Sequence, residues 1–167
     1  MQNNWPSGYG QRILQSVDST NAEAVRLAKE LSGPTWIFAH TQTAARGRRG
    51  RDWVQPQGNF GASLLLPDLE NPAEMGLRSF ITSLALYDAV RTVAGPSARL
   101  SLKWPNDVLL NGGKFAGILL ESVANGLVVG VGVNLAEAPK PSDVEEGAIA
   151  PVSLRAETGV SIAPEEF

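Results

Sequence analysis

The second half of the chain is divided by short turns that strongly favour a hairpin sheet. Four runs are rich in apolar residues: 100–104, 108–110, 114–121 and 127–135. An Asn-Gly-Gly turn at 111–113 and an Asn-Gly turn at 125–126 separate the last three runs. Turns of this kind join strands that pair antiparallel. The first two runs are separated by a Pro-Asn-Asp turn. The sequence therefore predicts a mostly antiparallel sheet in this half.

The first half alternates strands with helices. Residues 12–17, 35–41 and 60–66 have the composition of strands. Thr20 and Glu23 have the spacing of a capping box, which predicts a helix that ends at Gly33. Pro72 opens a long helix, and its apolar stripe is expected in the core: Leu77, Phe80, Ile81, Leu84 and Tyr87. The elements together predict an α+β fold, a mixed and mostly antiparallel sheet with helices packed on one face.

Composition limits the chemistry that the chain can perform. Its 167 residues have the size of a single domain, 1–167. There is no cysteine, so disulfides and thiolate chemistry are excluded. The only histidine, His40, lies in a predicted strand, which disfavours a Ser-His-Asp triad. No signal segment and no run of 18 apolar residues are present, so we expect a cytoplasmic protein that does not enter a membrane.

Arginine is concentrated in one short segment, residues 42–53. Arg46, Arg48, Arg49 and Arg51 fall within six residues and are separated by glycines, in a chain whose net charge is -3. Guanidinium groups and glycine backbone N–H groups can together surround an anion. A solvated basic loop and a nucleic-acid patch are the alternatives, and the acidic balance argues against general nucleic-acid binding.

Five motifs in order resemble those of the biotin protein ligases, the biotin–[acetyl-CoA-carboxylase] ligases. They are Asp-Ser-Thr-Asn at 18–21, the arginine loop at 45–51 followed by Trp53, Lys-Trp-Pro-Asn-Asp at 103–107, Lys-x-x-Gly-Ile-Leu-x-Glu at 114–121, and Gly-x-Gly-x-Asn at 130–134. The resemblance extends from about Gln11 to Phe167. It implies the catalytic fold of the biotin and lipoate ligases, which is related to that of class II aminoacyl-tRNA synthetases.

The resemblance also implies a two-step reaction. Biotin and ATP form biotinoyl-5′-adenylate and pyrophosphate, and a lysine of a biotin carboxyl carrier protein then takes the biotin and releases AMP. Lys114 and Arg48 would be catalytic, because a carboxylate must approach a polyphosphate and their repulsion has to be offset.

Binding residues are implied in the same way. The biotin site would comprise Ser19, Thr20, Asn21, Gln42, Arg46, Gly47, Arg48, Lys114 and Gly117. The ATP site would comprise Arg51, Trp53, Lys103, Asn106, Asp107 and Asn134, with Asp107 as a ligand of Mg²⁺.

The sequence departs from the family in three places. Ala45 replaces the first glycine of the arginine loop. We also expect the C-terminal SH3-like domain and the N-terminal DNA-binding domain to be absent, so no DNA partner is expected. A lipoate–protein ligase and a truncated biotin-binding domain with little transfer activity remain alternatives. The oligomeric state is open, with a homodimer as one option.

Residues after the last predicted strand carry less information. Residues 136–151 are rich in Pro, Glu and Ala and indicate a surface loop. Residues 152–158 predict a short helix, which Gly159 ends, and residues 164–167 predict the first turn of another.

Overall fold

A computed structural model describes residues 5–69, 71–145 and 147–167. Seven strands form a single sheet in the order β1-β2-β3-β7-β6-β5-β4. The strands are β1 (Gly10–Val17), β2 (Thr35–Gln42), β3 (Phe60–Pro67), β4 (Leu100–Lys103), β5 (Asp107–Leu110), β6 (Gly113–Val123) and β7 (Gly126–Val133). All seven strands of the sequence-based prediction are present, with ends that differ by one or two residues.

Pairing in the sheet is antiparallel except at one edge. β1 pairs with β2 in parallel, while β2–β3, β3–β7, β4–β5, β5–β6 and β6–β7 are antiparallel. The parallel pair is possible because a helix crosses between the two strands, whereas the late strands are joined by tight turns. The predicted fold class, α+β with a mixed and mostly antiparallel sheet, is confirmed.

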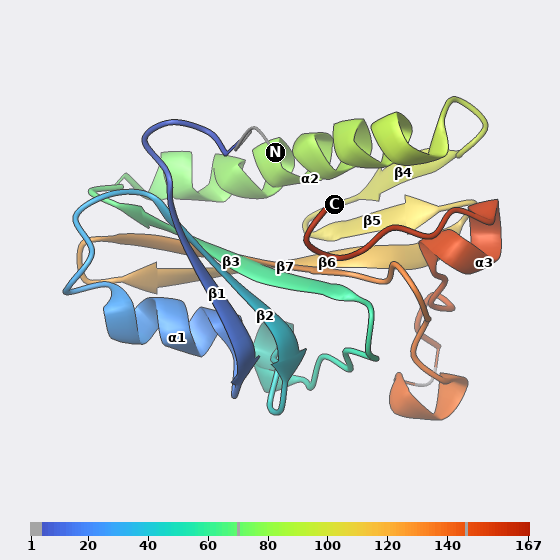
Figure 1. Ribbon diagram of the computed structural model, residues 1–167, viewed down its shortest axis with the longest axis horizontal. Coiled ribbons are helices and arrows are strands. Elements are labelled where there is room, and N and C mark those ends of the chain that lie inside the picture. The colour runs from blue at the N-terminus through green and yellow to red at the C-terminus, as the bar shows by residue number, and fades with distance from the viewer. Residues whose placement is uncertain (1–4, 70, 146) are drawn as a thin grey trace.

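The sequence suggested that the helices pack on one face of the sheet, but in the structure they lie on both faces. The α-helices are α1 (Thr20–Leu27), α2 (Pro72–Ala94) and α3 (Leu154–Thr158), and two 3₁₀ turns are η1 (Arg48–Gly50) and η2 (Pro141–Asp143). In Figure 1, α2 lies above the strands and α1 below them. Val128 of β7 packs with α1, and its neighbour Val129 packs with α2. Both faces of the central strands are apolar, so each needs its own cover.

The predicted core stripe of α2 is also wrong for most of its residues. Leu77 and Leu84 are each 56% exposed, and Phe80 and Ile81 are 47% and 51% exposed. The buried face carries Ser79, Ser83, Leu86 and Val90 instead. Small serine side chains let the first half of α2 approach the sheet closely, and the Ser79 hydroxyl donates to the Pro105 carbonyl. The apolar stripe is on the outer side of the helix.

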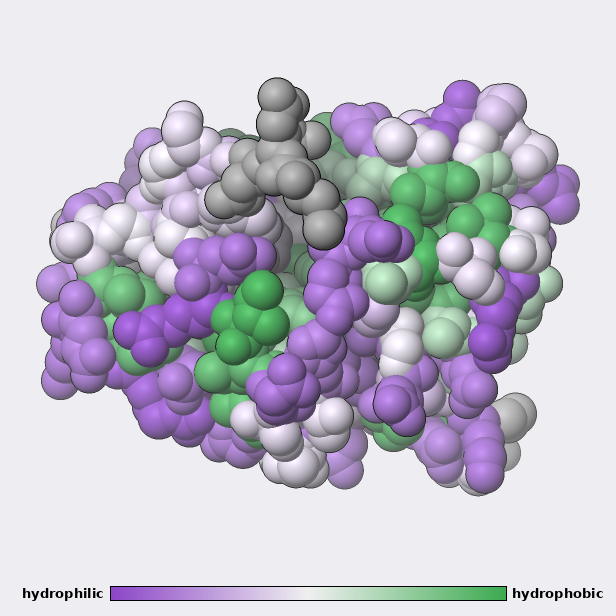
Figure 2. Space-filling model, viewed as in Figure 1, coloured by the Kyte–Doolittle hydropathy of each residue, from purple (hydrophilic) through white to green (hydrophobic). Residues whose placement is uncertain are grey.

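Two core clusters result from this arrangement. The larger one contains Leu86 and Val90 of α2, the facing residues of β5, β6 and β7, and Leu154 of α3. The smaller one contains Ala24 and Leu27 of α1 with residues of β2, β3 and β7. In the same view, the molecular surface shows hydrophobic patches separated by hydrophilic residues (Figure 2). No helix among the described residues is long and apolar enough to span a membrane.

The C-terminal segment returns to the sheet. Residues 164–166 form a turn, in agreement with the prediction, and the Phe167 ring lies 5.7 Å from that of Phe60. His40 lies in β2, as predicted, with its Nδ1 atom 3.1 Å from a carboxylate oxygen of Glu165. His40 does not line the cavity described below, so a triad built on it is excluded.

Candidate active site

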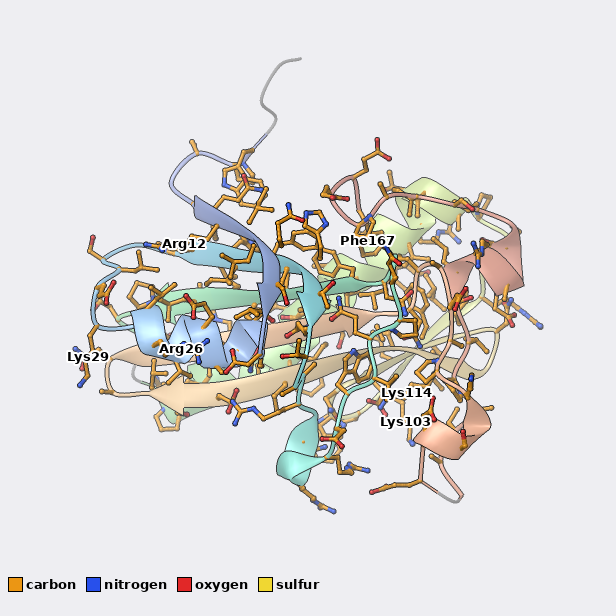
Figure 3. All side chains as sticks on the ribbon, turned by 60° about the horizontal axis from the view of Figure 1, so that its bottom comes forward. Arg12, Arg26, Lys29, Lys103, Lys114 and Phe167 are labelled. Carbon is orange, nitrogen blue, oxygen red and sulfur yellow. The ribbon has the colours of Figure 1, made fainter. Side chains whose placement is uncertain are left out.

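A cavity of about 760 Å³ lies on the α1 side of the sheet. Every residue that the sequence assigned to a site lines it: Ser19, Thr20, Asn21, Gln42, Arg46, Gly47, Arg48, Arg51, Trp53, Lys103, Asn106, Asp107, Lys114, Gly117 and Asn134. Lys103 and Lys114 both line the cavity, and Figure 3 shows them away from Arg26 on α1. The structure thus brings five motifs that are far apart in the chain to one place.

The start of α1 forms the polar end of the cavity. Ser19 is the N-cap, and its hydroxyl accepts from the Ala22 N–H, so the cap lies one residue before the predicted Thr20. Thr20 is thereby free to bond elsewhere. Its N–H and hydroxyl both donate to Gln42 Oε1, at 2.6 and 3.1 Å. Ser63 of β3 completes this group by donating to Asn21 Oδ1 at 2.5 Å, with Thr20 Oγ1 2.8 Å away.

Glycines on β6 and β7 make room for side chains on the α1 side of the sheet. A Cβ atom on Gly132 would lie 2.5 Å from the Trp53 ring, and one on Gly117 would lie 2.9 Å from it. A Cβ atom on Gly130 would collide with the Asn21 amide. The Gly-x-Gly spacing at 130–132 therefore seats one residue of α1 and one of the arginine loop on the same strand.

The arginine loop is a small hairpin that closes over the cavity. Its neck is held by hydrogen bonds from the Trp53 N–H to the Ala45 carbonyl, 2.9 Å, and from the Gly47 N–H to the Arg51 carbonyl, 2.7 Å. Ala45 is buried in the neck. Arg49, at the tip, has φ of 59°, a left-handed conformation that is unusual for a residue with a side chain.

Three arginines of the loop reach different partners around the cavity. Arg48 Nη1 donates to Asn106 Oδ1 at 2.9 Å, and the Asn106 amide in turn donates to the Ile118 carbonyl. Arg51 Nη1 lies 2.6 Å from Glu145 Oε2. Arg46 Nη2 lies 3.4 Å from Glu121 Oε1. Each contact joins the loop to a separate wall.

Lys114 and Asp107 form the charged floor. Lys114 Nζ is 3.0 Å from Asp107 Oδ1 and 5.7 Å from the centre of the Trp53 ring. The geometry at Asp107 Oδ1 is that of a close ion pair and not of a directed hydrogen bond, and the atom is buried. Asn134 Oδ1 is also buried without a hydrogen-bond partner among the described residues, while its amide donates to the Val152 carbonyl. Two oxygen acceptors are therefore available at this end.

A resident metal cluster is not built into the described part of the chain. No group of three or more His, Cys, Asp or Glu side chains is close enough there to hold an ion. The single carboxylate of Asp107 fits a magnesium ion that arrives with phosphate oxygens, because magnesium commonly uses one or two protein carboxylates together with those oxygens.

The ion pair between Asp18 and Arg26 lies beside the start of α1 and shifts the pKa of both groups. Arg26 donates two hydrogen bonds to the Asp18 carboxylate, which also accepts from the Ser19 N–H. These bonds hold the pKa of Asp18 well below its ordinary value, and Asp18 and Glu23 raise the pKa of Arg26. The bonds fix the turn that presents Ser19 and Thr20.

Part of the cavity wall was missed by the sequence analysis. Residues 139–149 were expected to form a surface loop, yet Pro139, Ser142, Asp143, Val144, Glu145, Gly147, Ala148 and Ile149 line the cavity. Ser63 and Gln55, which connect to its polar end, were also missed. None of these residues lies in a motif, so no signal in one sequence identifies them. Glu121 lies in a motif but was given no role.

The fold and the site together define a class of protein, an α+β catalytic domain whose cavity combines a cationic loop with a wall of hydroxyl and amide side chains. The chain belongs to the biotin/lipoate A/B protein ligase family, whose model matches residues 10–136. The match spans every motif that the sequence analysis singled out.

Relatives and solved structures support this membership. The chain is 54% identical over 160 residues to a biotin–[acetyl-CoA-carboxylase] ligase of Paracoccus denitrificans, covering 93% of this chain and 67% of that protein. Its structure resembles biotin protein ligase of Leishmania major in complex with biotinyl-5-AMP, with a TM-score of 0.81, 29% identity, and coverage of 97% and 70%. It also resembles the Aquifex aeolicus ligase in complex with biotin and ATP, with a TM-score of 0.75, 32% identity, and coverage of 94% and 64%. The chain spans about two thirds of the length of these proteins.

Proposed function

We propose that this chain activates biotin with ATP to biotinoyl-5′-adenylate and transfers the biotin to a lysine of a biotin carboxyl carrier protein. The observation that carries the proposal is the cavity itself. Lys114, Arg48 and Asp107 lie at the same cavity as the hydroxyl and amide groups of Ser19, Thr20, Asn21 and Gln42. A site of this kind can hold an uncharged polar head at one end and an anionic pair at the other.

The chemistry assigns a task to each end of the cavity. Ser, Thr, Asn and Gln offer both donors and acceptors, which a ureido group needs. Lys114 and Arg48 supply fixed positive charge where the biotin carboxylate meets the α-phosphate, and this lowers the barrier by electrostatic preorganisation. No protein nucleophile is required, in keeping with a chain that contains no cysteine.

The nucleotide belongs beside Trp53, Lys103, Asn106 and Asn134. The carboxylate of Asp107 and the unpartnered oxygen of Asn134 would hold Mg²⁺ together with the phosphates. The ion would neutralise phosphate charge and favour pyrophosphate as the leaving group. Because the reaction consumes ATP and modifies a carrier protein, a cytoplasmic location is part of the proposal.

Biotin-dependent exchange of labelled pyrophosphate into ATP tests the proposal. Exchange with biotin and none with lipoate is the expected result, and transfer is then measured on a carrier protein. A lipoate–protein ligase would exchange with lipoate, and a binding domain without catalysis would bind biotin but exchange with neither. The 54% identity to a biotin ligase favours biotin over lipoate.

A further inference from the structure

Glu121 lies between the two groups of residues that form the polar end of the cavity. It belongs to β6, where its neighbour across the strand pair is Val128 of β7. Its side chain is 29% exposed and reaches two partners. Asn21 Nδ2 donates to Glu121 Oε2 at 2.6 Å, and Arg46 Nη2 lies 3.4 Å from Oε1. One carboxylate thus connects the start of α1 to the arginine loop.

The contact with Glu121 fixes which way the Asn21 amide faces. An ionised carboxylate can only accept hydrogen bonds, so the NH₂ group of Asn21 must turn toward Glu121. Its Oδ1 atom then faces Ser63, whose hydroxyl donates to it at 2.5 Å. Asn21 is only 4% exposed and is held against Gly130, and a rotated amide would place its oxygen, an acceptor, against the Glu121 carboxylate, which also only accepts.

The other end of the same network is fixed in a similar way. The Gln55 amide donates to the Asn59 carbonyl at 3.3 Å, and the Gln42 amide donates to Gln55 Oε1 at 2.5 Å. Gln42 Oε1 is therefore left to accept from Thr20. Both ends of the network terminate at an acceptor, a carboxylate at one end and a backbone carbonyl at the other.

The direction of these bonds decides what the cavity offers to a ligand. One N–H of the Asn21 amide is directed to Glu121, and one N–H of the Gln42 amide is directed to Gln55. Each amide keeps a second N–H, and the oxygen atoms of Thr20 and Asn21 can still accept, so this wall offers both donors and acceptors. Such a wall favours a head group that carries N–H donors together with a carbonyl acceptor, as a cyclic urea does.

We propose that Glu121 is a positioning residue that acts through Asn21, because it holds the Asn21 amide in the orientation that a ligand head with N–H donors and a carbonyl acceptor requires. The inference rests on the proposed function, since it concerns the same ligand. The Arg46 contact is secondary, because it is longer and Arg46 is 45% exposed. Glu121 is not among the residues that line the cavity, so it is assigned an indirect role.

Three substitutions separate the effect of Glu121 on the orientation of the Asn21 amide from the effect of its charge opposite Arg46. Glu121→Ala removes the acceptor, whereas Glu121→Gln keeps an oxygen that can accept from Asn21 but removes the charge opposite Arg46. Asn21→Ala, alone and combined with Glu121→Ala, tests whether Glu121 acts through Asn21. Glu137→Ala is the matched control, because Glu137 forms an exposed ion pair with Arg155 and does not line the cavity.

Calorimetric titration of the full chain with biotin measures the Kd of each variant. Glu121→Ala should raise the Kd for biotin about tenfold, the equivalent of about 1.4 kcal/mol of binding free energy. Glu121→Gln should recover most of the loss, and Glu137→Ala should show none. In pyrophosphate exchange, the KM for biotin should rise more than kcat falls. Glu121→Ala should add little in the Asn21→Ala background.

Three results would overturn the proposal. They are biotin binding by Glu121→Ala at the wild-type Kd, equal weakening by Glu121→Gln and Glu121→Ala, and fully additive effects of Glu121→Ala and Asn21→Ala. A readout without any ligand is the ¹H–¹⁵N signal of the Asn21 side-chain amide. Its protection from exchange should be lost in Glu121→Ala and kept in Glu121→Gln. If the wild-type chain neither binds biotin nor exchanges pyrophosphate, the proposed function fails, while this signal still decides whether Glu121 orients Asn21.

Discussion

Lys114 Nζ lies 3.0 Å from Asp107 Oδ1, across the β5–β6 strand pair. Each group neutralises the other in the absence of ligand, with 32% of the lysine side chain and 17% of the aspartate side chain exposed. A phosphate that enters the cavity can replace the carboxylate as the partner of Lys114, which leaves Asp107 free for a metal ion. The ion pair holds both side chains in place before substrates bind.

Replacement of Lys114 by alanine should suppress adenylate formation. The loss of one preorganised charge at the developing transition state is expected to lower the rate by about 10²–10³-fold. Single-turnover formation of biotinoyl-adenylate measures this directly. Lys29→Ala, in the exposed turn that follows α1 and outside the cavity, is the control. Adenylate formation at the wild-type rate by Lys114→Ala would remove this residue from the mechanism.

Biotin should reduce the mobility of the arginine loop. The loop is rich in glycine, and apart from its neck it is held by side-chain contacts such as that of Arg48 with Asn106. Hydrogen exchange across residues 42–53 should slow when biotin or the adenylate is bound, because a ligand anion adds partners for the guanidinium groups. Exchange across α2 serves as the internal reference. Equal protection of the loop with and without ligand would contradict closure.

A side chain at residue 132 should disturb the seat of Trp53. Gly132→Ala would place Cβ 2.5 Å from the Trp53 ring, and overpacking of this kind costs about 1–3 kcal/mol of unfolding free energy. Gly76→Ala is the matched control, since nothing lies within 4 Å of the added Cβ. In that helical position alanine should stabilise by about 0.5–1 kcal/mol. Urea denaturation of both variants checks the opposite signs.

The two faces of α2 should respond differently to the same mutation. Leu86 is 6% exposed, so Leu86→Ala should cost about 2–5 kcal/mol of unfolding free energy. Leu84, two residues away, is 56% exposed, and Leu84→Ala should stay within about 0.5 kcal/mol of wild type. Equal losses in a denaturation experiment would show that the outer stripe is covered in solution.

The Asp18–Arg26 pair should stabilise the fold in a pH-dependent way. The hydrogen bonds from Arg26 hold the pKa of Asp18 below its ordinary value, so the unfolded chain binds its proton at a higher pH than the folded chain. The contribution is present above the unfolded pKa of about 3.9 and is lost as the pH falls toward the folded pKa. Wild type should therefore exceed Asp18→Asn in unfolding free energy at pH 7, and the difference should shrink at pH 3. A constant difference would exclude this linkage.

The sequence determined the strands, the order of the elements and the motif residues that meet at the cavity. Asn-Gly turns permit only short connections, so the antiparallel pairing of β5, β6 and β7 follows from local chemistry. The cluster of arginines and the spacing of Gly130, Gly132 and Asn134 were visible for the same reason, because each depends on residues close together in the chain.

Tertiary structure decided which face each side chain took. Helix α2 has apolar residues on two sides. The sequence alone does not show that Ser79 and Ser83 pack against the sheet while Leu77 and Leu84 are exposed. Likewise, consecutive residues of β7 are apolar, so both of its faces are apolar. Only the positions of α1 and α2 showed that the sheet is covered on both sides.

Contacts over long separations were also beyond the sequence. Glu121 meets Asn21 across 100 residues, and Arg51 meets Glu145 across 94. Residues 139, 142–145 and 147–149 became part of the cavity wall, although their composition is that of a surface loop. A turn or a cap is specified by its neighbours in the chain, whereas the partners of a charged side chain depend on how the whole sheet brings distant segments together.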